Sequence, residues 1–425
     1  MSCLVCKRWG RVSASEGFWG RLFEVRCRPL GFSDKDGLMA SIKLSSLLCR
    51  GIWSSPTWRR LADETSVLVP FDGVEHNAVL KPRQGSSMAI LKEKDRGGAV
   101  LYGGWTTQGI FNDIWILGDH LEWKLVGILR PHVSTYGHVL TKGPESDTSS
   151  VFYVSGGVTR GGYGGATNQL VRFEIPHDVM WKSPQETYSD VIRFSVLRQP
   201  FTTDGSNAGS RRAYHSVEYI FDRLLLYFGG FDEDGVIADL ELYDIESDTF
   251  SKPSVLTSGP DARFGHTSVV VSKNNETTSI LYCGGTNAPN NMKHRFGNDV
   301  EYEDMYLLTI HSADLTCTWD TITFESPNGV SFQRCHSSTM LGHPNSILVF
   351  GGGLPGTNSC AMLSLNVEEK SAVMRDTLTT LSPSSRQNHS AVWLKDDCVL
   401  VFGGASGTQE PQEELGDTFI FTITV

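Results

Sequence analysis

Arginine and histidine recur in this sequence at a regular spacing, and their side chains are suited to binding anions and to proton transfer. One position of the repeat holds histidine in five of six copies: Ser86, His138, His215, His266, His336 and His389. Arginine stands three residues before this position in four copies and two residues before it in another: Arg83, Arg212, Arg263, Arg386 and Arg334. A catalytic site breaks the symmetry of a repeat, whereas these residues follow it. We therefore expect structural, hydrogen-bonded histidines at strand starts and no enzymatic activity.

Motifs of known enzymes and cofactor sites do not accompany these residues. The glycine-rich stretch 156–166 lacks the Gly-Lys-Ser/Thr ending of a phosphate-binding loop, and neither Gly-x-Ser-x-Gly nor His-Glu-x-x-His occurs. Cys3 and Cys6 form one C-x-x-C pair, but a structural zinc site needs a second ligand pair at a matching spacing. We expect neither a metal nor a cofactor.

The composition narrows the class of protein further. A net charge of −11 and the lack of a Lys/Arg run argue against a nucleic-acid partner. Because the chain shows no secretory leader and no apolar stretch of membrane-spanning length, we expect a cytoplasmic or nuclear protein without a membrane partner. A length of 425 residues suggests two or three domains, or one large repeat fold.

Short apolar strands must position the arginines and histidines. Six apolar runs each end in a Gly-Gly pair, at 103–104, 156–157, 229–230, 284–285, 351–352 and 403–404. The most regular copy runs from Arg212 to Phe250, where alternating apolar residues between Gly and Asp clusters predict four antiparallel strands in a row. Such a sheet cannot bury both faces alone, so its copies must pack against one another.

Two further marks recur in the repeat. A third strand begins at an aspartate in the better copies, at Asp113, Asp239, Asp304 and Asp417. A late aromatic residue closes the first four copies: Trp123, Trp181, Phe250 and Trp319. Together these marks resemble the kelch repeat. The resemblance implies an all-β fold, a six-bladed propeller over residues 57–425, in which glycines let the chain leave a crowded inner strand and aromatics fill the gaps between blades.

The two ends of the predicted propeller complement each other. The sixth copy reaches Val425 without a fourth strand, and the residues TWRRL at 57–61 look like a fourth strand with no copy before it. We expect this N-terminal strand to complete the sixth blade and so to remove an open sheet edge.

Residues 1–25 carry two apolar groups at helical spacing around a polar break. The run VCKRW at 5–9, followed by FW at 18–19, resembles the C-terminal half of an F-box, whose first half would lie before Met1. This resemblance implies contact with a Skp1-type adaptor, and through it a cullin, by Val5, Trp9, Phe18 and Trp19. The chain start is either part of a longer F-box or a remnant that docks less well, and a two-helix cap is the alternative. Residues 26–56 should form a helical linker.

One end of the propeller is the expected binding face. In a four-strand meander, the connections from second to third strand and from fourth strand to the next blade lie at the same end, and the long insertions 182–211 and 286–303 are assigned to these classes. We expect partner-binding residues there: Arg83, Trp105, Arg160, Arg212, Phe231, Arg263, Arg334 and Arg386. Arginines with aromatics suit an acidic or phosphorylated protein segment. The alternative is that the arginines are buried in hydrogen bonds between blades.

The order of partial F-box, linker and propeller resembles F-box/kelch proteins. That resemblance implies a substrate-recognition subunit of an SCF-type cullin ubiquitin ligase, whose loop face holds the target protein. A kelch interaction scaffold without a ligase role is the alternative.

Overall fold

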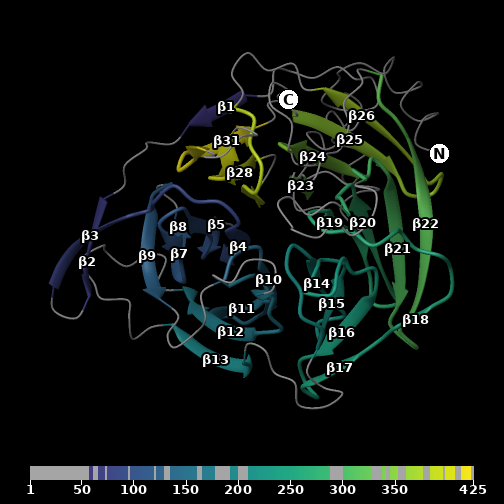
Figure 1. The fold of residues 1–425 in the computed structure, drawn as a ribbon, viewed down its shortest axis with the longest axis horizontal. Helices are drawn as coiled ribbons and strands as arrows, with labels where there is room; N and C mark the ends of the chain where they lie inside the picture. Colours follow the sequence, from purple (N-terminus) through teal and green to yellow (C-terminus); the bar gives the residue numbers. More distant parts are fainter. Residues whose placement is uncertain are drawn as a thin grey trace, which may run out of the picture.

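Apolar runs between glycine and aspartate turns fold into short antiparallel strands, which are grouped into six blades around a common axis (Figure 1). The computed structural model describes residues 57–60, 66–71, 74–93, 96–118, 121–128, 135–159, 165–177, 192–199, 209–287, 300–327, 337–340, 345–352, 360–376, 383–395, 398–406 and 413–422. The predicted all-β propeller is confirmed.

Blades 1 to 3 are regular four-strand meanders. Blade 1 contains β4 (Ser87–Glu93), β5 (Arg96–Tyr102), β8 (Asp113–Leu117) and β9 (Trp123–Ile128). Blade 2 contains β10 (Val139–Glu145), β11 (Ser149–Ser155), β12 (Leu170–Pro176) and β13 (Arg193–Arg198). Blade 3 contains β14 (Ser216–Ile220), β15 (Leu224–Phe228), β16 (Leu240–Asp244) and β17 (Thr249–Ser251). In each blade the first strand lies nearest the axis and the fourth at the rim (Figure 1).

Blades 4 and 5 share a continuous sheet because their outer strands touch. Blade 4 contains β19 (Thr267–Lys273), β20 (Thr277–Cys283), β21 (Met305–His311) and β22 (Thr316–Glu325). Blade 5 contains β23 (Ser337–Met340), β24 (Ser346–Phe350), β25 (Cys360–Asn366) and β26 (Ser371–Asp376). The end of β22 pairs in parallel with the start of β26, and β18 (Ser254–Val255) pairs in parallel with the start of β22.

Blade 6 joins the two ends of the described chain. It contains β27 (Ser390–Lys395), β28 (Cys398–Phe402), β31 (Thr418–Thr422) and, as its fourth strand, β1 (Thr57–Arg60). The antiparallel register runs from Thr57 opposite Thr422 to Arg60 opposite Phe419. This is the pairing expected of the N-terminal strand, and Figure 1 shows β1 beside β31.

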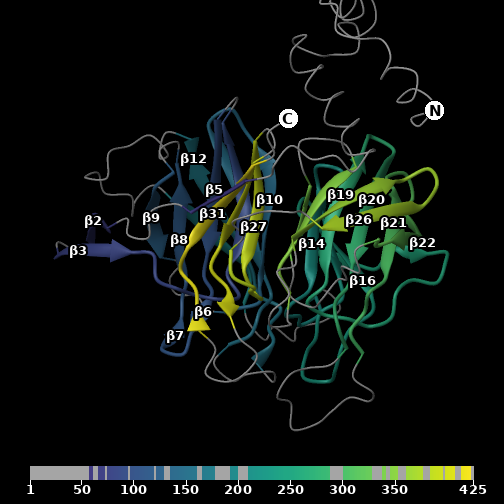
Figure 2. The same ribbon diagram turned by 90° about the horizontal axis from the view of Figure 1, so that it is seen from above.

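Three short hairpins in the described part of the chain lie outside the blades. They are β2 (Ser66–Phe71) with β3 (Val74–Val79), β6 (Trp105–Thr106) with β7 (Gly109–Ile110), and β29 (Ala405–Ser406) with β30 (Glu413–Glu414). Seen from the side, β2 and β3 project beyond the rim near β9, and β6 and β7 extend from one end of the blades (Figure 2). No helix in the described part of the chain is long and apolar enough to cross a membrane.

The apolar core is divided among the contacts between blades. Six clusters of buried side chains each join two neighbouring blades, including blade 6 with blade 1. Trp123 of blade 1 lies 5.8 Å from the ring of Phe402 in blade 6, and Trp319 of blade 4 lies 5.2 Å from Phe228 in blade 3. The predicted role of the late aromatics, filling the gaps between blades, is confirmed at these positions.

The glycine pairs are explained by the histidines that pack on them. Gly229 has a φ of 63°, and a Cβ atom there would lie 2.8 Å from Cε1 of His266 in the next blade. Gly230 has a φ of 93°, and a Cβ atom there would lie 2.8 Å from Cβ of His215 in its own blade. A side chain at either position would therefore meet both backbone strain and a steric clash.

The fourth strand of blade 2 differs from the expectation. The late aromatic Trp181 lies outside the described residues, and the strand that pairs with β12 is β13, within the supposed loop 182–211. Pro176, the last residue of the third strand, and Arg193, the first residue of the fourth, therefore lie at the end opposite to the expected binding face. Predicting 182–211 as one loop on that face was wrong, because the pairing partner of β12 was assigned from one aromatic residue. The segments 1–25 and 26–56 lie outside the described residues.

Candidate functional site

The loop face is the end of the propeller at which second strands lead to third strands and fourth strands lead to the next blade. Arg83 enters blade 1 there, and its side chain is only 1% exposed. Its Nη1 and Nη2 donate to the two carboxylate oxygens of Asp113 at 2.6 and 2.9 Å, and Nη1 also donates to the carbonyl of Gly103 at 2.9 Å. One guanidinium therefore links the entry of the first strand, the end of the second and the start of the third.

The same arrangement recurs in blades 4 and 6. Arg263 donates to both carboxylate oxygens of Asp304 and to the carbonyl of Gly284. Arg386 donates to both oxygens of Asp417 and to the carbonyl of Gly403. These guanidinium groups also lie over aromatic rings, at 4.1 Å from Tyr302 and 5.3 Å from Phe419.

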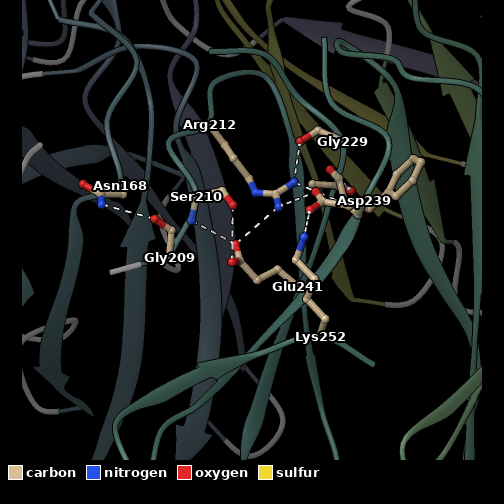
Figure 3. A network of polar contacts seen from close by, with 10 residues as sticks. Asn168, Gly209, Ser210, Arg212, Gly229, Asp239, Glu241 and Lys252 are labelled. Atoms are coloured by element: carbon tan, nitrogen blue, oxygen red, sulfur yellow. Dashed lines mark hydrogen bonds and ion pairs between the residues drawn. The ribbon is translucent and has the colours of Figure 1, made fainter. Parts of the chain in front are cut away.

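Blade 3 has a larger version of this network. Nη1 of Arg212 donates to the carbonyl of Gly229 at 3.0 Å, and Nη2 donates to Asp239 at 2.7 Å and to Glu241 at 3.3 Å (Figure 3). Lys252 reaches the second carboxylate oxygen of Asp239 at 2.7 Å. Burial alone would raise the pKa of the Asp239 carboxyl, but Arg212 and Lys252 outweigh burial and hold that pKa below its usual value.

Blade 2 replaces the ion pair with neutral groups. Thr135 stands at the arginine position and Gln169 at the aspartate position. Nε2 of Gln169 donates to Oγ1 of Thr135 at 2.8 Å and to the carbonyl of Gly156 at 3.1 Å. The glycine carbonyl thus keeps its hydrogen-bond donor, although the donor now comes from the third strand.

The four described arginines are therefore parts of the blade framework. With 1% exposure at Arg83, Arg212, Arg263 and Arg386, none offers its guanidinium to a protein at the loop face. Predicting them as partner-binding residues was wrong, and the buried alternative holds, with carboxylate partners in the same blade. These four arginines therefore do not support the predicted binding of an acidic or phosphorylated protein segment. Arg160 and Arg334, like Val5, Trp9, Phe18 and Trp19, lie outside the described residues.

The histidines serve the contacts between blades. His138 contacts the carbonyls of Thr135 and Tyr102 through its two ring nitrogens, at 3.0 and 3.2 Å, and burial lowers its pKa to about 4. His266 of blade 4 contacts Oγ of Ser216 in blade 3 at 2.9 Å. The predicted structural, hydrogen-bonded role is confirmed for these two histidines. His215 is equally buried, yet both of its ring nitrogens lack a hydrogen-bond partner in the described structure.

A collar of peptide groups surrounds the axis just before the histidines. The N–H of Gly85 donates to the carbonyl of Asn388, Gly137 to Gly85, Tyr214 to Gly137, and Gly265 to Tyr214, over 2.8 to 3.0 Å. These five residues have left-handed φ angles between 52° and 63°. Such angles suit glycine and asparagine, whereas Tyr214 adopts one with a bulky side chain, which marks a strained position.

The collar bounds a cavity on the axis at the loop face. Its volume is about 200 Å³, and it is lined by Gly85, Ser86, Ser87, Gly137, His138, Tyr214, His215, Gly265, His266, Asn388 and His389. Aromatic rings stand beside it, with Trp105 and Tyr136 5.1 Å apart and Tyr136 and Tyr214 6.4 Å apart. Phe231 stacks on Tyr214 at 5.9 Å and is 1% exposed. Of the predicted partner-binding residues that the structure describes, Trp105 is therefore the one that is partly exposed.

Sequence reasoning missed Tyr136 and Tyr214. The position before the histidine, or before Ser86 in blade 1, holds Gly in three described copies and Asn in another, so the bulky residue at 214 departs from the repeat. That departure was the available signal, because residues that break the symmetry of a repeat are free to serve function.

Comparison with known proteins agrees with this architecture. Kelch domain-containing protein 3 of rat and of mouse is each 29% identical over 199 residues, covering 45% of this chain and 46% of the relative. The human protein of the same name is 29% identical over 200 residues, with the same coverage. The chain thus spans about half the length of the curated relatives it matches. A family profile described as the Attractin/LZTR1 β-propeller matches residues 182–420, more than half of the chain, and the chain belongs to this family of kelch-type propellers.

Proposed function

We propose that this protein is a non-enzymatic protein-interaction module whose loop face holds a target protein. The proposal depends on one observation: the arginines that could bind anions or substrates are buried in every described blade that contains them. Arg83, Arg212, Arg263 and Arg386 are each used inside their own blade. The ion pairs fix the bases of the loops, and loops on a rigid framework are the usual place for recognition.

Substituting the partly exposed aromatic residues of the loop face tests this function. The full chain is used as bait for protein partners in a cell lysate, beside a variant with Trp105→Ala and Tyr136→Ala. Phe194→Ala is the control, because this aromatic is 43% exposed and lies on the outer strand β13. We expect the double variant to lose partners that the control retains. Identical partner sets for all three proteins would contradict the proposal.

A ligase role is the second candidate, favoured by the F-box pattern of Val5, Trp9, Phe18 and Trp19. In this role the N-terminal segment docks the Skp1-type adaptor of an SCF-type cullin ubiquitin ligase. The propeller presents the bound target, and a partner enzyme transfers ubiquitin.

Co-purification with the adaptor tests the ligase role. The full chain, including any residues that precede Met1 in the cell, should capture the adaptor, and Trp9→Ala with Trp19→Ala should reduce the capture strongly. The control is Trp105→Ala, since Trp105 belongs to the propeller. Lack of capture by the unaltered chain would exclude the ligase role and leave the interaction scaffold.

A further inference from the structure

The charge of the described loop face differs from the charge that its arginines suggest. Each buried arginine is balanced within its blade by an aspartate, and Arg212 has Glu241 as an additional partner. Among the other described bases at this face, Arg211 pairs with Glu233 at 2.7 Å and Lys252 pairs with Asp239 at 2.7 Å, whereas Lys81 at the entry of blade 1 is exposed. The repeat therefore contributes little net positive charge here.

Exposed carboxylates remain at the same face, on two adjacent blades. Asp234 lies in the connection between β15 and β16 of blade 3. Asp261 precedes the first strand of blade 4, and Glu303 precedes its third strand. All three are exposed, and none has an ion-pair partner among the described residues. We call Asp234, Asp261 and Glu303 the acidic patch.

The neighbouring cavity on the axis has the size and lining for one long side chain. Its volume of about 200 Å³ is below the roughly 300–1,000 Å³ typical of small-molecule pockets. His215 lines it, is 5% exposed, and has no hydrogen-bond partner on either ring nitrogen among the described residues. Oδ1 of Asn388, which also lines the cavity, is buried and equally without a described partner.

The imidazoles that line the cavity add no positive charge to it. Burial, assisted by Arg212, keeps the pKa of His215 well below its usual value, and burial lowers the pKa of His138 to about 4. Both imidazoles are therefore neutral near pH 7, and the two ring nitrogens of His138 are already used by the carbonyls of Thr135 and Tyr102. The charge of Arg212 is itself balanced by Asp239 and Glu241.

The rim of the cavity adds aromatic faces. Trp105, Tyr136 and Tyr214 form a continuous row of ring contacts beside the opening. Faces of aromatic rings attract ammonium and guanidinium groups. Tyr214 maintains this row at the cost of a left-handed backbone that the equivalent glycines adopt without strain.

We propose that the cavity mouth binds a basic segment of a partner protein, with one lysine or arginine side chain entering beside His215 and further basic residues lying over the acidic patch. This inference rests on the proposed protein-binding function and adds the chemistry of the partner. The net charge of −11 for the whole chain favours approach of such a segment.

Two matched peptide pools test the charge preference. Both are fluorescein-labelled dodecapeptides, one with Lys or Arg and the other with Asp or Glu at every third position. Fluorescence anisotropy with the purified full chain should give at least about tenfold tighter binding of the basic pool at low salt, and raising the salt to about 0.5 M should weaken it. Equal binding of the pools, or tighter binding of the acidic pool, would overturn the inference.

Matched charge reversals locate the site. The test variant combines Asp234→Lys, Asp261→Lys and Glu303→Lys. The control variant combines Glu246→Lys, Glu276→Lys and Glu368→Lys, which makes the same charge change in exposed turns at the opposite end of the blades. The test variant should bind the basic pool about tenfold more weakly, because each exposed pair contributes a few-fold. Equal losses in both variants would overturn the inference.

A further variant separates ring attraction from general apolar contact. Trp105→Leu with Tyr136→Leu keeps apolar bulk and removes the ring faces. Although the acidic patch is intact in this variant, it should bind the basic pool more weakly than the unaltered chain does. Unchanged binding would overturn the part assigned to the aromatic rim. If the charge-reversed chain captures cellular partners as well as the unaltered chain does, the protein-binding function stands and the basic-segment inference fails.

Discussion

Arg386 and Asp417 meet through two parallel N–H···O contacts of 2.6 and 3.1 Å, although they lie at the entry of the first strand and the start of the third strand of blade 6. Because Arg386 also donates to the carbonyl of Gly403, one buried side chain fixes three segments of the blade. The same set in blades 1 and 4 makes this contact a property of the repeat.

Breaking this pair from one side should be costly. Asp417→Ala leaves the charge of the buried Arg386 without its carboxylate, so we expect the free energy of unfolding to fall by about 3–5 kcal/mol. Arg386→Met combined with Asp417→Ala should recover a large part of this loss. Urea unfolding measures both. Lys142→Ala, which breaks the exposed pair with Glu145, is the control and should cost less than about 1 kcal/mol; equal losses in the two single variants would refute the framework role.

The packing of His266 on Gly229 predicts that a side chain at position 229 destabilises the protein. Gly229→Ala should lower the free energy of unfolding by about 2 kcal/mol or more, because its φ is left-handed and the new Cβ would meet Cε1 of His266 at 2.8 Å. Gly127→Ala is the control, since the nearest atom there is the flexible end of Ile192 at 3.2 Å. Thermal unfolding compares them, and a larger loss for Gly127→Ala would contradict the explanation.

The pH dependence of stability should have two opposing parts. Burial lowers the pKa of His138 to about 4 and that of His215 well below its usual value, so their stabilisation is full above about pH 6.5 and is lost as the pH falls toward 4. Burial raises the pKa of Glu218 to about 7, although the hydroxyl of Ser268 donates to it and partly opposes this. Its stabilisation is full below about pH 4.5 and is lost as the pH rises through 7.

Glu218→Gln isolates the second part. Relative to the unaltered protein, the variant should gain stability between pH 4.5 and 7, at no more than about 1.4 kcal/mol per pH unit. Urea midpoints at several pH values measure the difference. A constant difference across that range would show that Glu218 ionises as it does in the unfolded chain.

Closure of the ring by β1 gives a fourth prediction. Deleting residues 57–62 removes the strand whose four residues all pair with β31, and we expect the melting temperature to fall by about 5–10 °C. Deleting 66–79 is the control, because β2 and β3 pair with each other. If the two deletions lowered the melting temperature equally, the closing strand would contribute no more than a peripheral hairpin.

Much of the fold followed from the sequence because the repeat marks have local causes. Glycine is required where a histidine ring packs on the backbone, as at Gly229 with His266, and the same contact recurs at Gly103, Gly156 and Gly351 irrespective of the loops. The fourth strand of blade 2 was misplaced because Trp181 resembled the late aromatic of other copies. A strand position after a long insertion is decided by backbone pairing, here of Val171 with Val196, which one sequence does not reveal.

The role of the arginines could have been derived from the repeat itself. Arginine at the strand entry and aspartate at the third strand occur together in blades 1, 3, 4 and 6, and blade 2 has neither, with Thr135 and Gln169 instead. This joint occurrence is the sign of a contact inside the blade. The acidic patch and Tyr214 were harder to predict, because their significance depends on which charges are already neutralised and on which backbone angle the collar imposes.

Pairing of β1 with β31 also determines how the propeller would respond to mechanical force. A protein-unfolding motor that pulls on the chain before Thr57 would apply its force first to the four residue pairs between β1 and β31, and only later to the other blades. Once these pairs shear, blade 6 loses its outer strand, and the apolar cluster that joins it to blade 1 becomes the next barrier. Resistance to extraction from the N-terminal side is therefore concentrated at one seam of the ring.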